Sequence, residues 1–357
     1  MKIRDATDAD LAAIARVAND SELLTGDLDE ASFPAMLSWL YAGAPPGVRV
    51  QFVAEHDERI VAHYGAMPVR YRLLGEDCVA GFASNLVIDR EYRAGMLFMS
   101  LQSHLHRQAR EKRFRFVYGL ITRANVLEPH LRMGWKKIGT APVYAKPFDF
   151  PAAAASVIRA PALRAAARLP LKAAEALWRA RWSLARTPGV TVEEADGFGA
   201  DADAFLAAFT ARWEIGAVRD RTILNWRFRG CPGRAYRIFV ARRDGRFAGY
   251  AVTRVMSLKH LRGLVLVDVA FDPADRGAGA ALLARCDREA MRARADVAAA
   301  LVNPSSPVLP HLRRFGYLKT PEAFTLVVRA AKDAPEPAFS EALFPRWHLT
   351  WFDHDYV

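Results

Sequence analysis

The sequence contains little cysteine and no long hydrophobic run. Among its 357 residues only Cys78, Cys231 and Cys286 are cysteines, and three distant thiols predict neither a disulfide framework nor a thiolate metal site. No apolar run approaches the roughly 18 residues that a membrane span needs. The first residues enter a charged pattern at once, without the apolar region of a signal peptide. We therefore expect a reduced, cytoplasmic protein without a bound metal.

What is present indicates a folded, basic protein. Apolar residues make up 52% of the chain, and 50 Lys and Arg outnumber 39 Asp and Glu, for a net charge of +11. This composition excludes a mainly disordered chain. At roughly 100–200 residues per domain, the length suggests two units. The positive charge favours anions such as nucleotide phosphates, nucleic acid or anionic lipid.

Acidic residues are nearly absent between residues 151 and 187. This Ala-rich segment carries seven Lys and Arg residues against one acid, Glu175. We expect Pro161 and Pro170 to break it into helical pieces. The favoured interpretation is a solvated connector between domains. The alternative is a basic amphipathic surface that makes weak peripheral contact with an anionic membrane through residues 151–186.

The same order of elements occurs on both sides of this connector. Alternating and helical periodicities predict strands 50–54, 60–66, 69–74 and 79–83, helix 97–110, strand 114–121 and helix 126–133, and later strands 236–240, 247–253 and 264–271, helix 278–292, strand 298–302 and helix 308–315. The predicted class is α/β (α+β), with two mixed, mostly antiparallel sheets flanked by helices. The expected division is a domain at 1–150, a helical linker at 151–189 and a domain at 190–357.

In each copy a strand runs through a short basic turn directly into a helix. The first turn spans residues 90–96, and the second spans residues 273–279. Amide groups at a helix N-terminus lack intrahelical partners, and the dipole adds roughly half a positive charge there. Such a turn predicts an anion site that suits a pyrophosphate. The expected ligands are Arg93, Ala94, Gly95, Met96 and Leu97 in the first copy and Arg276, Gly277 and Gly279 in the second.

Each turn is followed by an asparagine, a short helix and a glycine–aromatic pair. These are Asn125 with Gly134-Trp135, and Asn303 with Gly316-Tyr317. Together with the opening Ile3-Arg4-x-Ala6-Thr7-x-x-Asp10, they resemble the GNAT superfamily of acyl-CoA-dependent N-acyltransferases. The chain looks like a tandem GNAT protein, and residues 60–101 are most similar to the Eis-related branch. The resemblance covers residues 1–145 well and 190–330 more loosely.

The resemblance implies direct attack of a neutral amine on the thioester of acetyl-CoA or another acyl-CoA. Backbone N–H groups of the strand, at Leu86, Val87 and Ile88, would polarise the thioester carbonyl. Asn125 would contact the cofactor, and His130 stands where the family has its general acid. The candidates for the general base are Glu55 and Asp89. The expected acceptor is the primary amine of a small molecule, with an amino sugar as our guess.

The sequence also departs from the family pattern. Gly95 is displaced by one position, and Met96 and Phe98 stand where small residues are usual. The second copy satisfies the loop spacing but has Leu312, which cannot donate a proton, at the acid position. The wider context places the acyl-CoA site in the first half.

Other interpretations remain open at this stage. His130 could fill space beside Trp135, Asn125 could be a helix N-cap, and Glu55 and Asp89 could be surface carboxylates. The protein could be a Fem-like aminoacyl transferase that uses aminoacyl-tRNA, or a non-catalytic acyl-CoA-binding module. Direct nucleic-acid regulation is not expected, because the charge is spread along the chain. Oligomeric state is not predicted.

Overall fold

A computed structural model describes residues 1–24, 28–93, 96–155, 158, 160–183, 189–331, 334 and 336–354. The chain divides into two compact units, and neither is continuous in sequence. The first comprises Met1–Thr140, Thr210–Arg234 and Phe324–Trp347, and the second Ala141–Phe209, Ala235–Ala323 and His348–Val357. This differs from the expected division at 150 and 190, because each half of the chain contributes segments to the unit that the other half mainly builds.

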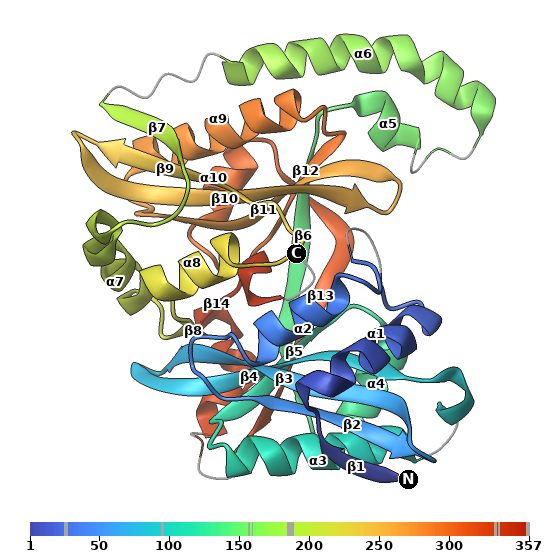
Figure 1. Cartoon of the computed structure of the whole chain (residues 1–357). Helices are drawn as coiled ribbons and strands as arrows, with labels where there is room; N and C mark the ends of the chain where they lie inside the picture. Colours follow the sequence, from blue (N-terminus) through green and yellow to red (C-terminus); the bar gives the residue numbers. More distant parts are fainter. Residues whose placement is uncertain are drawn as a thin grey trace. The chain divides into compact units, whose positions relative to one another are not determined.

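The sheet of the first unit is mixed and mostly antiparallel (Figure 1). Its successive antiparallel neighbours are β1 (Lys2–Asp5), β2 (Val50–His56), β3 (Arg59–Leu73) and β4 (Glu76–Ile88). β5 (Phe116–Ile121) pairs parallel with β4, and the last residues of β13 (Leu318–Ala330) pair antiparallel with β5. β8 (Ile215–Ala217) pairs with the end of β3.

Helices cover both faces of this sheet. α1 (Leu11–Asp20) and α2 (Phe33–Tyr41) lie on one face and α3 (Leu97–Glu111) on the other (Figure 1). α4 (Ala124–Arg132) lies beside α3, where His130 bonds to Gln102. Side chains alternate between the two faces along a strand. Phe52 and Tyr64 therefore pack with the leucines of α3, while the ring of Tyr41 lies against the neighbouring Gly65. α8 (Arg221–Arg229) also belongs here, and its Trp226 stacks on Trp39 with 4.4 Å between ring centroids.

The second unit repeats this kind of sheet. The last residues of β6 (Lys136–Pro147) pair antiparallel with β12 (Val297–Leu301), which runs parallel to β11 (Leu261–Phe271). β10 (Arg246–Leu258), β9 (Arg237–Arg243) and β7 (Val190–Ala195) follow as antiparallel neighbours. Its helices are α5 (Phe150–Ala155), α6 (Pro161–Ser183), α7 (Asp203–Ala211), α9 (Arg276–Arg292) and α10 (Leu309–Arg314). The mixed, mostly antiparallel α/β class expected from the sequence is confirmed.

Two of the expected boundaries are wrong. Residues 60–66 and 69–74 belong to one strand, β3. On one side of β3, β2 pairs only as far as Ala66 and β8 pairs only from Tyr71. Pro68 lies between these two pairings, so its missing N–H removes no hydrogen bond to either strand. Pro170 likewise does not end α6, which runs for 23 residues. Its Ala, Leu and Arg neighbours are strong helix formers, which offset the cost of one proline.

Candidate functional site

The parallel strands of each unit separate toward their carboxyl ends. In the first unit the register of β4 with β5 ends at the pair Phe82–Tyr118, yet β4 continues to Ile88. In the second unit the register of β11 with β12 ends at Leu266–Ala300, and β11 continues to Phe271. Along the described strands, the last residues of β4 and β11 therefore leave an opening on the side of their parallel neighbour.

A β-bulge lies at the opening in the first unit. Between the pairs His63–Val87 and Gly65–Ser84, one residue of β3 faces two residues of β4, Asn85 and Leu86. Asn85 has φ of 54°, the left-handed conformation that asparagine tolerates better than most residues. A bulge re-aims the backbone groups beside it, so the peptide between Asn85 and Leu86 departs from the regular ladder.

Buried polar groups hold this bulge in place. His63 Nδ1 lies 2.8 Å from the carbonyl oxygen of Asn85. A carbonyl can only accept, so Nδ1 carries the proton, and Nε2 accepts from the side-chain amide of Gln51 at 3.1 Å. Burial lowers the pKa of His63 to about 4, so the ring is neutral at pH 7. The hydroxyl of Tyr41 accepts from Asn85 Nδ2 at 3.2 Å and lies 3.0 Å from Ser84 Oγ.

This arrangement sets the direction of one N–H group. The described chain has no cis peptide bond, and in a trans peptide the C=O and the N–H point in opposite directions. The Asn85 carbonyl points toward His63, so the N–H of Leu86 points away from it. Sequence reasoning missed His63, Gln51 and Tyr41. The only available signal was a histidine inside an otherwise apolar strand.

The first turn is anchored at both of its described ends. Asp89 accepts from the backbone N–H of Glu91 at 3.1 Å and from Arg59 Nη2 at 2.7 Å, and Arg93 Nε donates to the carbonyl of Ile88 at 2.9 Å. The expected ligands Ala94 and Gly95 lie outside the described residues. α3 then begins at Leu97 with Met96 as its N-cap, and no side chain of the described chain caps it.

In the second turn, the carboxylate of Asp275 occupies the N-terminus of the helix that follows. Asp275 is the N-cap of α9, and its Oδ1 accepts from the N–H of Ala278 at 2.9 Å. Its Oδ2 accepts from Arg243 Nε at 2.7 Å, and this guanidinium lowers the pKa of Asp275. Packing explains the two glycines of the turn: a Cβ at Gly277 would meet Arg243, and one at Gly279 would meet the ring of Phe271.

His130, the proposed acid, is held inside the first unit by both ring nitrogens. Nδ1 lies 2.7 Å from the carbonyl of Val126, so it donates, and Nε2 accepts from Gln102 Nε2 at 2.9 Å. Gln102 in turn accepts from Trp135 Nε1 at 3.2 Å. Burial lowers the pKa of His130, so the ring is neutral at pH 7. The rings of His130 and Trp135 meet edge to face, with 5.3 Å between their centroids. This is the contact that the packing interpretation expects.

The other expected residues lie in more than one place. Glu55 receives a hydrogen bond from Arg4 Nε at 2.8 Å and pairs with Ile60, while Asp89 follows the end of β4 and donates its N–H to Val61. Both carboxylates therefore lie toward the same end of the strands, the end at which β4 stops. Asn125 is exposed and is the second residue of α4, whose N-cap is Arg123. The expectation that Asn125 caps this helix is wrong, because the chain turns helical one residue before it.

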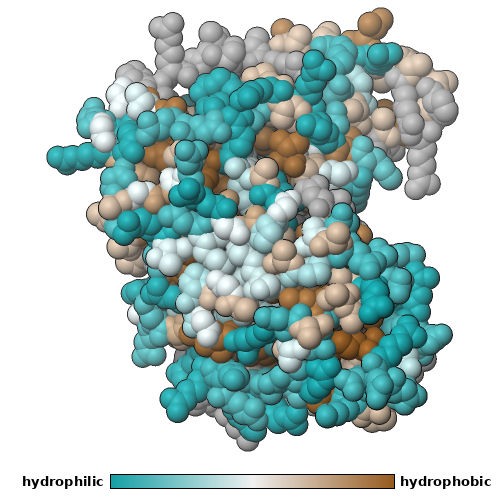
Figure 2. Space-filling view, in the orientation of Figure 1, coloured by the Kyte–Doolittle hydropathy of each residue, from teal (hydrophilic) through white to brown (hydrophobic). Residues whose placement is uncertain are grey.

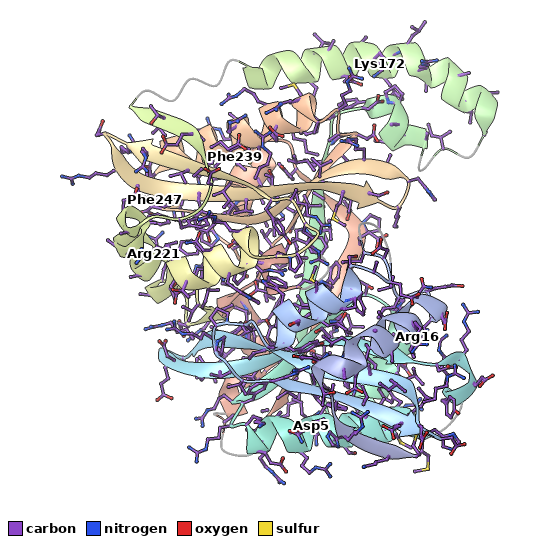
Figure 3. The ribbon with its side chains drawn as sticks, in the orientation of Figure 1. Asp5, Arg16, Lys172, Arg221, Phe239 and Phe247 are labelled. Atoms are coloured by element: carbon purple, nitrogen blue, oxygen red, sulfur yellow. The ribbon has the colours of Figure 1, made fainter. Side chains whose placement is uncertain are left out.

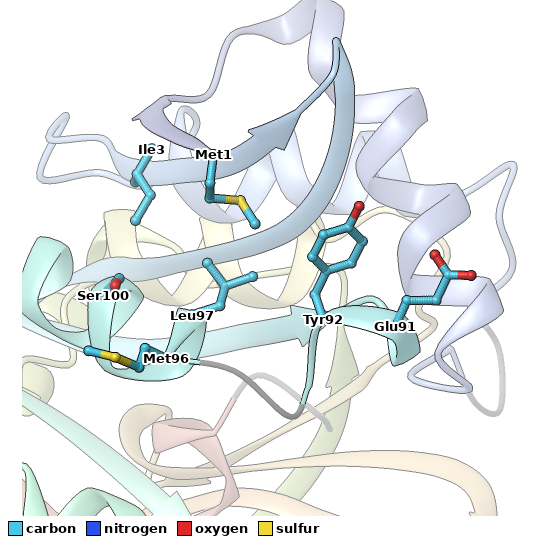
Figure 4. Close-up of a pocket in the computed structure, with 7 residues that line it drawn as sticks. All are labelled: Met1, Ile3, Glu91, Tyr92, Met96, Leu97 and Ser100. Carbon is cyan, nitrogen blue, oxygen red and sulfur yellow. The ribbon is translucent and has the colours of Figure 1, made fainter.

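A half-open pocket of about 480 Å³ lies beside the first turn (Figure 4). β1, the turn and the first turn of α3 line it through Met1, Ile3, Glu91, Tyr92, Met96, Leu97 and Ser100. Tyr92 is oriented by a 3.0 Å hydrogen bond between its hydroxyl and His56 Nδ1. Within the described ranges, no three His, Cys, Asp or Glu side chains are grouped to hold a metal ion, and no helix is both long and apolar enough to cross a membrane.

Comparison with known proteins shows the fold. No family profile matches the chain, and no curated protein matches it in sequence. Among solved structures, yeast (Saccharomyces cerevisiae) N-myristoyltransferase with bound myristoyl-CoA has a TM-score of 0.62 at 13% identity, over 94% of this chain and 83% of that one. A GCN5-related N-acetyltransferase from Kribbella flavida has a TM-score of 0.61 at 15% identity, and the match covers 94% of this chain and 72% of that one. A putative acetyltransferase from Pyrococcus horikoshii has a TM-score of 0.55 at 12% identity, and the match covers 95% of this chain and 92% of that one. The chain therefore has a GNAT-like fold.

Proposed function

We propose that this protein is an acyl-CoA-dependent N-acyltransferase whose donor site lies in the first unit. One observation carries the proposal: the separated end of β4, with its fixed bulge, leads through the basic turn into α3, whose N-terminus no described side chain caps. In the second unit the equivalent amides already face Asp275. An anionic carrier would have to displace that carboxylate there, but not in the first unit.

The geometry supports the following division of roles. The amides at the start of α3 and the turn with Arg93 would hold the diphosphate of the donor. The N–H of Leu86, turned away from His63, would donate to the thioester oxygen as charge develops on it, with Val87 and Ile88 extending the same strand end. The amine nitrogen attacks the carbonyl carbon, the C–N bond forms, and the C–S bond breaks to release the CoA thiolate. The cavity beside Met96 would receive part of the donor.

The proposed reaction also needs a base for the amine proton and an acid for the thiolate. Glu55, near the end of β2, and Asp89, which follows β4, remain our candidates for the base that takes the amine proton. Each already binds an arginine, so water would have to carry the proton to it. His130, the acid that the resemblance implies, could protonate the thiolate only after exchanging one of its two internal hydrogen bonds.

The fold comparisons support the reaction class and leave the substrates as proposals. The solved structures include a myristoyltransferase with its acyl-CoA and several N-acetyltransferases. We propose acetyl-CoA as the donor, with a longer acyl chain as the alternative, and the primary amine of a small molecule, such as an amino sugar, as the acceptor. A tandem GNAT organisation, similarity to the Eis-related branch and a cytoplasmic location belong to the same proposal.

A second candidate function is a non-catalytic acyl-CoA-binding module. The observation that favours it is the internal engagement of every proton-transfer candidate: His130 at both ring nitrogens, and Glu55 and Asp89 with arginines. Such a protein would bind the donor through α3 but would not turn it over.

Binding and turnover measured side by side test the proposal. Acetyl-CoA and a longer acyl-CoA should each be titrated by calorimetry, and thiol release followed with a panel of primary amines. At a hundredfold excess over Kd, a ligand that binds only the folded state adds about 2.7 kcal/mol of stability, which a thermal melt detects. Thiol release that depends on an amine supports the enzyme. Binding without release supports the module, and absence of binding contradicts both.

A further inference from the structure

The pocket beside the first turn gathers the most exposed apolar side chains of the first unit. Among the described residues of this unit, no large hydrophobic side chain is more exposed than Met96, at 71%, and Met1, at 60%, and both line the pocket. Figure 2 shows mostly hydrophilic residues along the lower edge of the view, where β1 and α3 lie in Figure 1. Apolar atoms that stay exposed around a concave site are typical of a surface that a ligand covers.

The pocket lies between one end of β1 and the first turn of α3. At the other end of β1, Asp5 Oδ1 accepts a hydrogen bond from Gln108 Nε2 of α3 at 3.2 Å, and Figure 3 labels Asp5 next to this helix. At the pocket, Met1 and Ile3 of β1 face Leu97 of α3 (Figure 4). The volume of about 480 Å³ falls within the roughly 300–1,000 Å³ of small-molecule sites.

Tyr92 forms an aromatic wall on one side of the pocket (Figure 4). Its hydroxyl lies 3.0 Å from His56 Nδ1, and the two rings meet edge to face with 5.6 Å between their centroids. These contacts orient the tyrosine ring. Aromatic side chains stack on nucleic-acid bases whatever the base, and methionine sulfur makes favourable contacts with aromatic rings. The lining therefore suits a flat aromatic ring.

The charge of the lining favours a base over a phosphate. Glu91 lines the pocket and is exposed, and the seven described lining residues include no lysine or arginine. A carboxylate accepts hydrogen bonds, for example from the amino group of adenine, but repels a phosphate. The diphosphate of a nucleotide therefore belongs outside the pocket.

The pocket and the strand opening lie on opposite sides of β4. The opening is on the side of β4 that faces β5, whereas the pocket is at β1, which is three strands away on the other side. The start of α3 connects the two places, because Met96 and Leu97 belong both to the pocket lining and to the expected ligands of the diphosphate.

This order matches the order of groups in coenzyme A. There the diphosphate joins the pantetheine arm, which carries the thioester, to the adenosine. A donor that runs from the opening to the start of α3 therefore continues toward the pocket with its adenosine. We propose, resting on the function proposed above, that the pocket binds the adenine ring of the acyl-CoA donor and that Tyr92 stacks on this ring.

Calorimetry with two acetyl thioesters tests the proposal on the full chain. Acetyl-CoA carries the adenosine, whereas acetyl-phosphopantetheine lacks it and keeps the thioester arm. Tyr92→Leu should weaken acetyl-CoA binding about tenfold or more, as expected for the loss of one stacked base, and should change acetyl-phosphopantetheine binding less than about twofold. Tyr92→Phe keeps the ring and should retain acetyl-CoA affinity within about threefold.

A matched pair of variants on α3 separates the pocket from the rest of the helix. Met96→Ala removes a lining residue and should weaken acetyl-CoA binding about threefold. Met99 is 42% exposed on the same helix and is not among the lining residues, so Met99→Ala should have less than half that effect. Circular dichroism and a thermal melt verify that each variant is folded.

The two thioesters distinguish failure of this inference from failure of the donor site. If the wild type binds neither, the proposed donor site is contradicted and the adenine pocket with it. If the wild type binds both with equal affinity, or if Tyr92→Leu weakens both alike, the donor site stands and the adenine pocket is overturned.

Discussion

The two strand–turn–helix segments of this chain follow the same plan but end differently. Both place a bulge where parallel strands separate: at Asn85 and Leu86 in β4, and at Val267 in β11, opposite the step from Val252 to Thr253. In the first unit the following helix has no side-chain cap. In the second, Asp275 caps it, and the buried Asp268 beside the bulge accepts from Tyr250 at 2.8 Å and from Thr350 at 2.9 Å.

We propose that this difference separates a turn that stabilises the fold from a turn that binds a ligand. A carboxylate at a helix N-terminus satisfies the same amides that would bind a phosphate. Where the chain supplies the carboxylate itself, as at Asp275, the turn stabilises the fold. Where it does not, as at Met96, the amides remain available to a ligand. The four predictions below test this contrast, from the largest expected effect to the smallest.

The helices after the two turns also cover different buried polar contacts. Under α9, Lys146 Nζ donates to Asp287 at 2.5 Å, and both side chains are buried. Under α3 the contact is the neutral pair of Gln102 and His130. Asp287→Ala removes the carboxylate that faces a buried lysine, and should lower the free energy of unfolding by roughly 3–5 kcal/mol. Gln102→Ala should cost about 1–3 kcal/mol.

Urea unfolding of both variants measures these costs. The double variant Lys146→Met/Asp287→Leu serves as control and should recover most of the stability, because it removes both charges. A cost below about 1 kcal/mol for Asp287→Ala would show that this pair does not distinguish the two units.

The two helix N-termini can be exchanged by single substitutions. Met96→Asp gives α3 the kind of cap that α9 has, and should weaken acetyl-CoA binding at least about a hundredfold, since like charges placed together cost several kcal/mol. Met96 is 71% exposed, so the fold should tolerate the change. Calorimetry measures the affinity. Met96→Ser, a neutral cap, is the control for capping without charge.

The reciprocal variant is Asp275→Ala, which removes both the cap and its charge from α9 and should change acetyl-CoA affinity less than twofold. A large gain of binding in Asp275→Ala, or unchanged binding in Met96→Asp, would move the donor site to the second unit or remove it.

The bulge in the first unit depends on a histidine that must stay neutral. The pKa of His63 is about 4 in the folded protein and about 6.5 in an unfolded chain. Between these values the unfolded state binds more protons, so stability falls as the pH decreases from 6.5 to 4. His63→Gln removes this titration. Its free energy of unfolding should therefore vary with pH less steeply, by up to about 1.4 kcal/mol per pH unit.

Chemical unfolding at closely spaced pH values between 4 and 7 measures this slope. NMR titration of the ring protons provides the check, because a His63 that titrates near 6.5 would contradict the buried, neutral state.

The smallest effect concerns His130. If both ring nitrogens stay engaged with Val126 and Gln102, His130→Gln should change kcat less than about threefold while lowering Tm. A general acid contributes about a hundredfold or more. A fall of that size in kcat, at unchanged acceptor KM, would restore His130 to the acid role and weaken the case for a binding module.

Much of the fold could be predicted from the sequence because its signals are local. These signals are the apolar runs of β2 and β3, the helical spacing of Leu97, Leu101 and Leu105, and the pairs Gly134-Trp135 and Gly316-Tyr317, each of which acts over a few residues. The candidate site could be predicted only in part. Met96 and Leu97 follow from the strand–turn–helix order, but His63 and Gln51 reach Asn85 only through the register between separate strands.

The sequence by itself determined the order of helices and strands, the positive charge of the 151–187 segment and the position of the two turns, because these depend on near neighbours in the chain. Tertiary structure decided the rest. It placed Arg243 on Asp275, directed the N–H of Leu86 through a buried histidine, and left the leucines of α6 exposed. Contacts between distant segments depend on how strands pair and helices pack, and no local pattern records that.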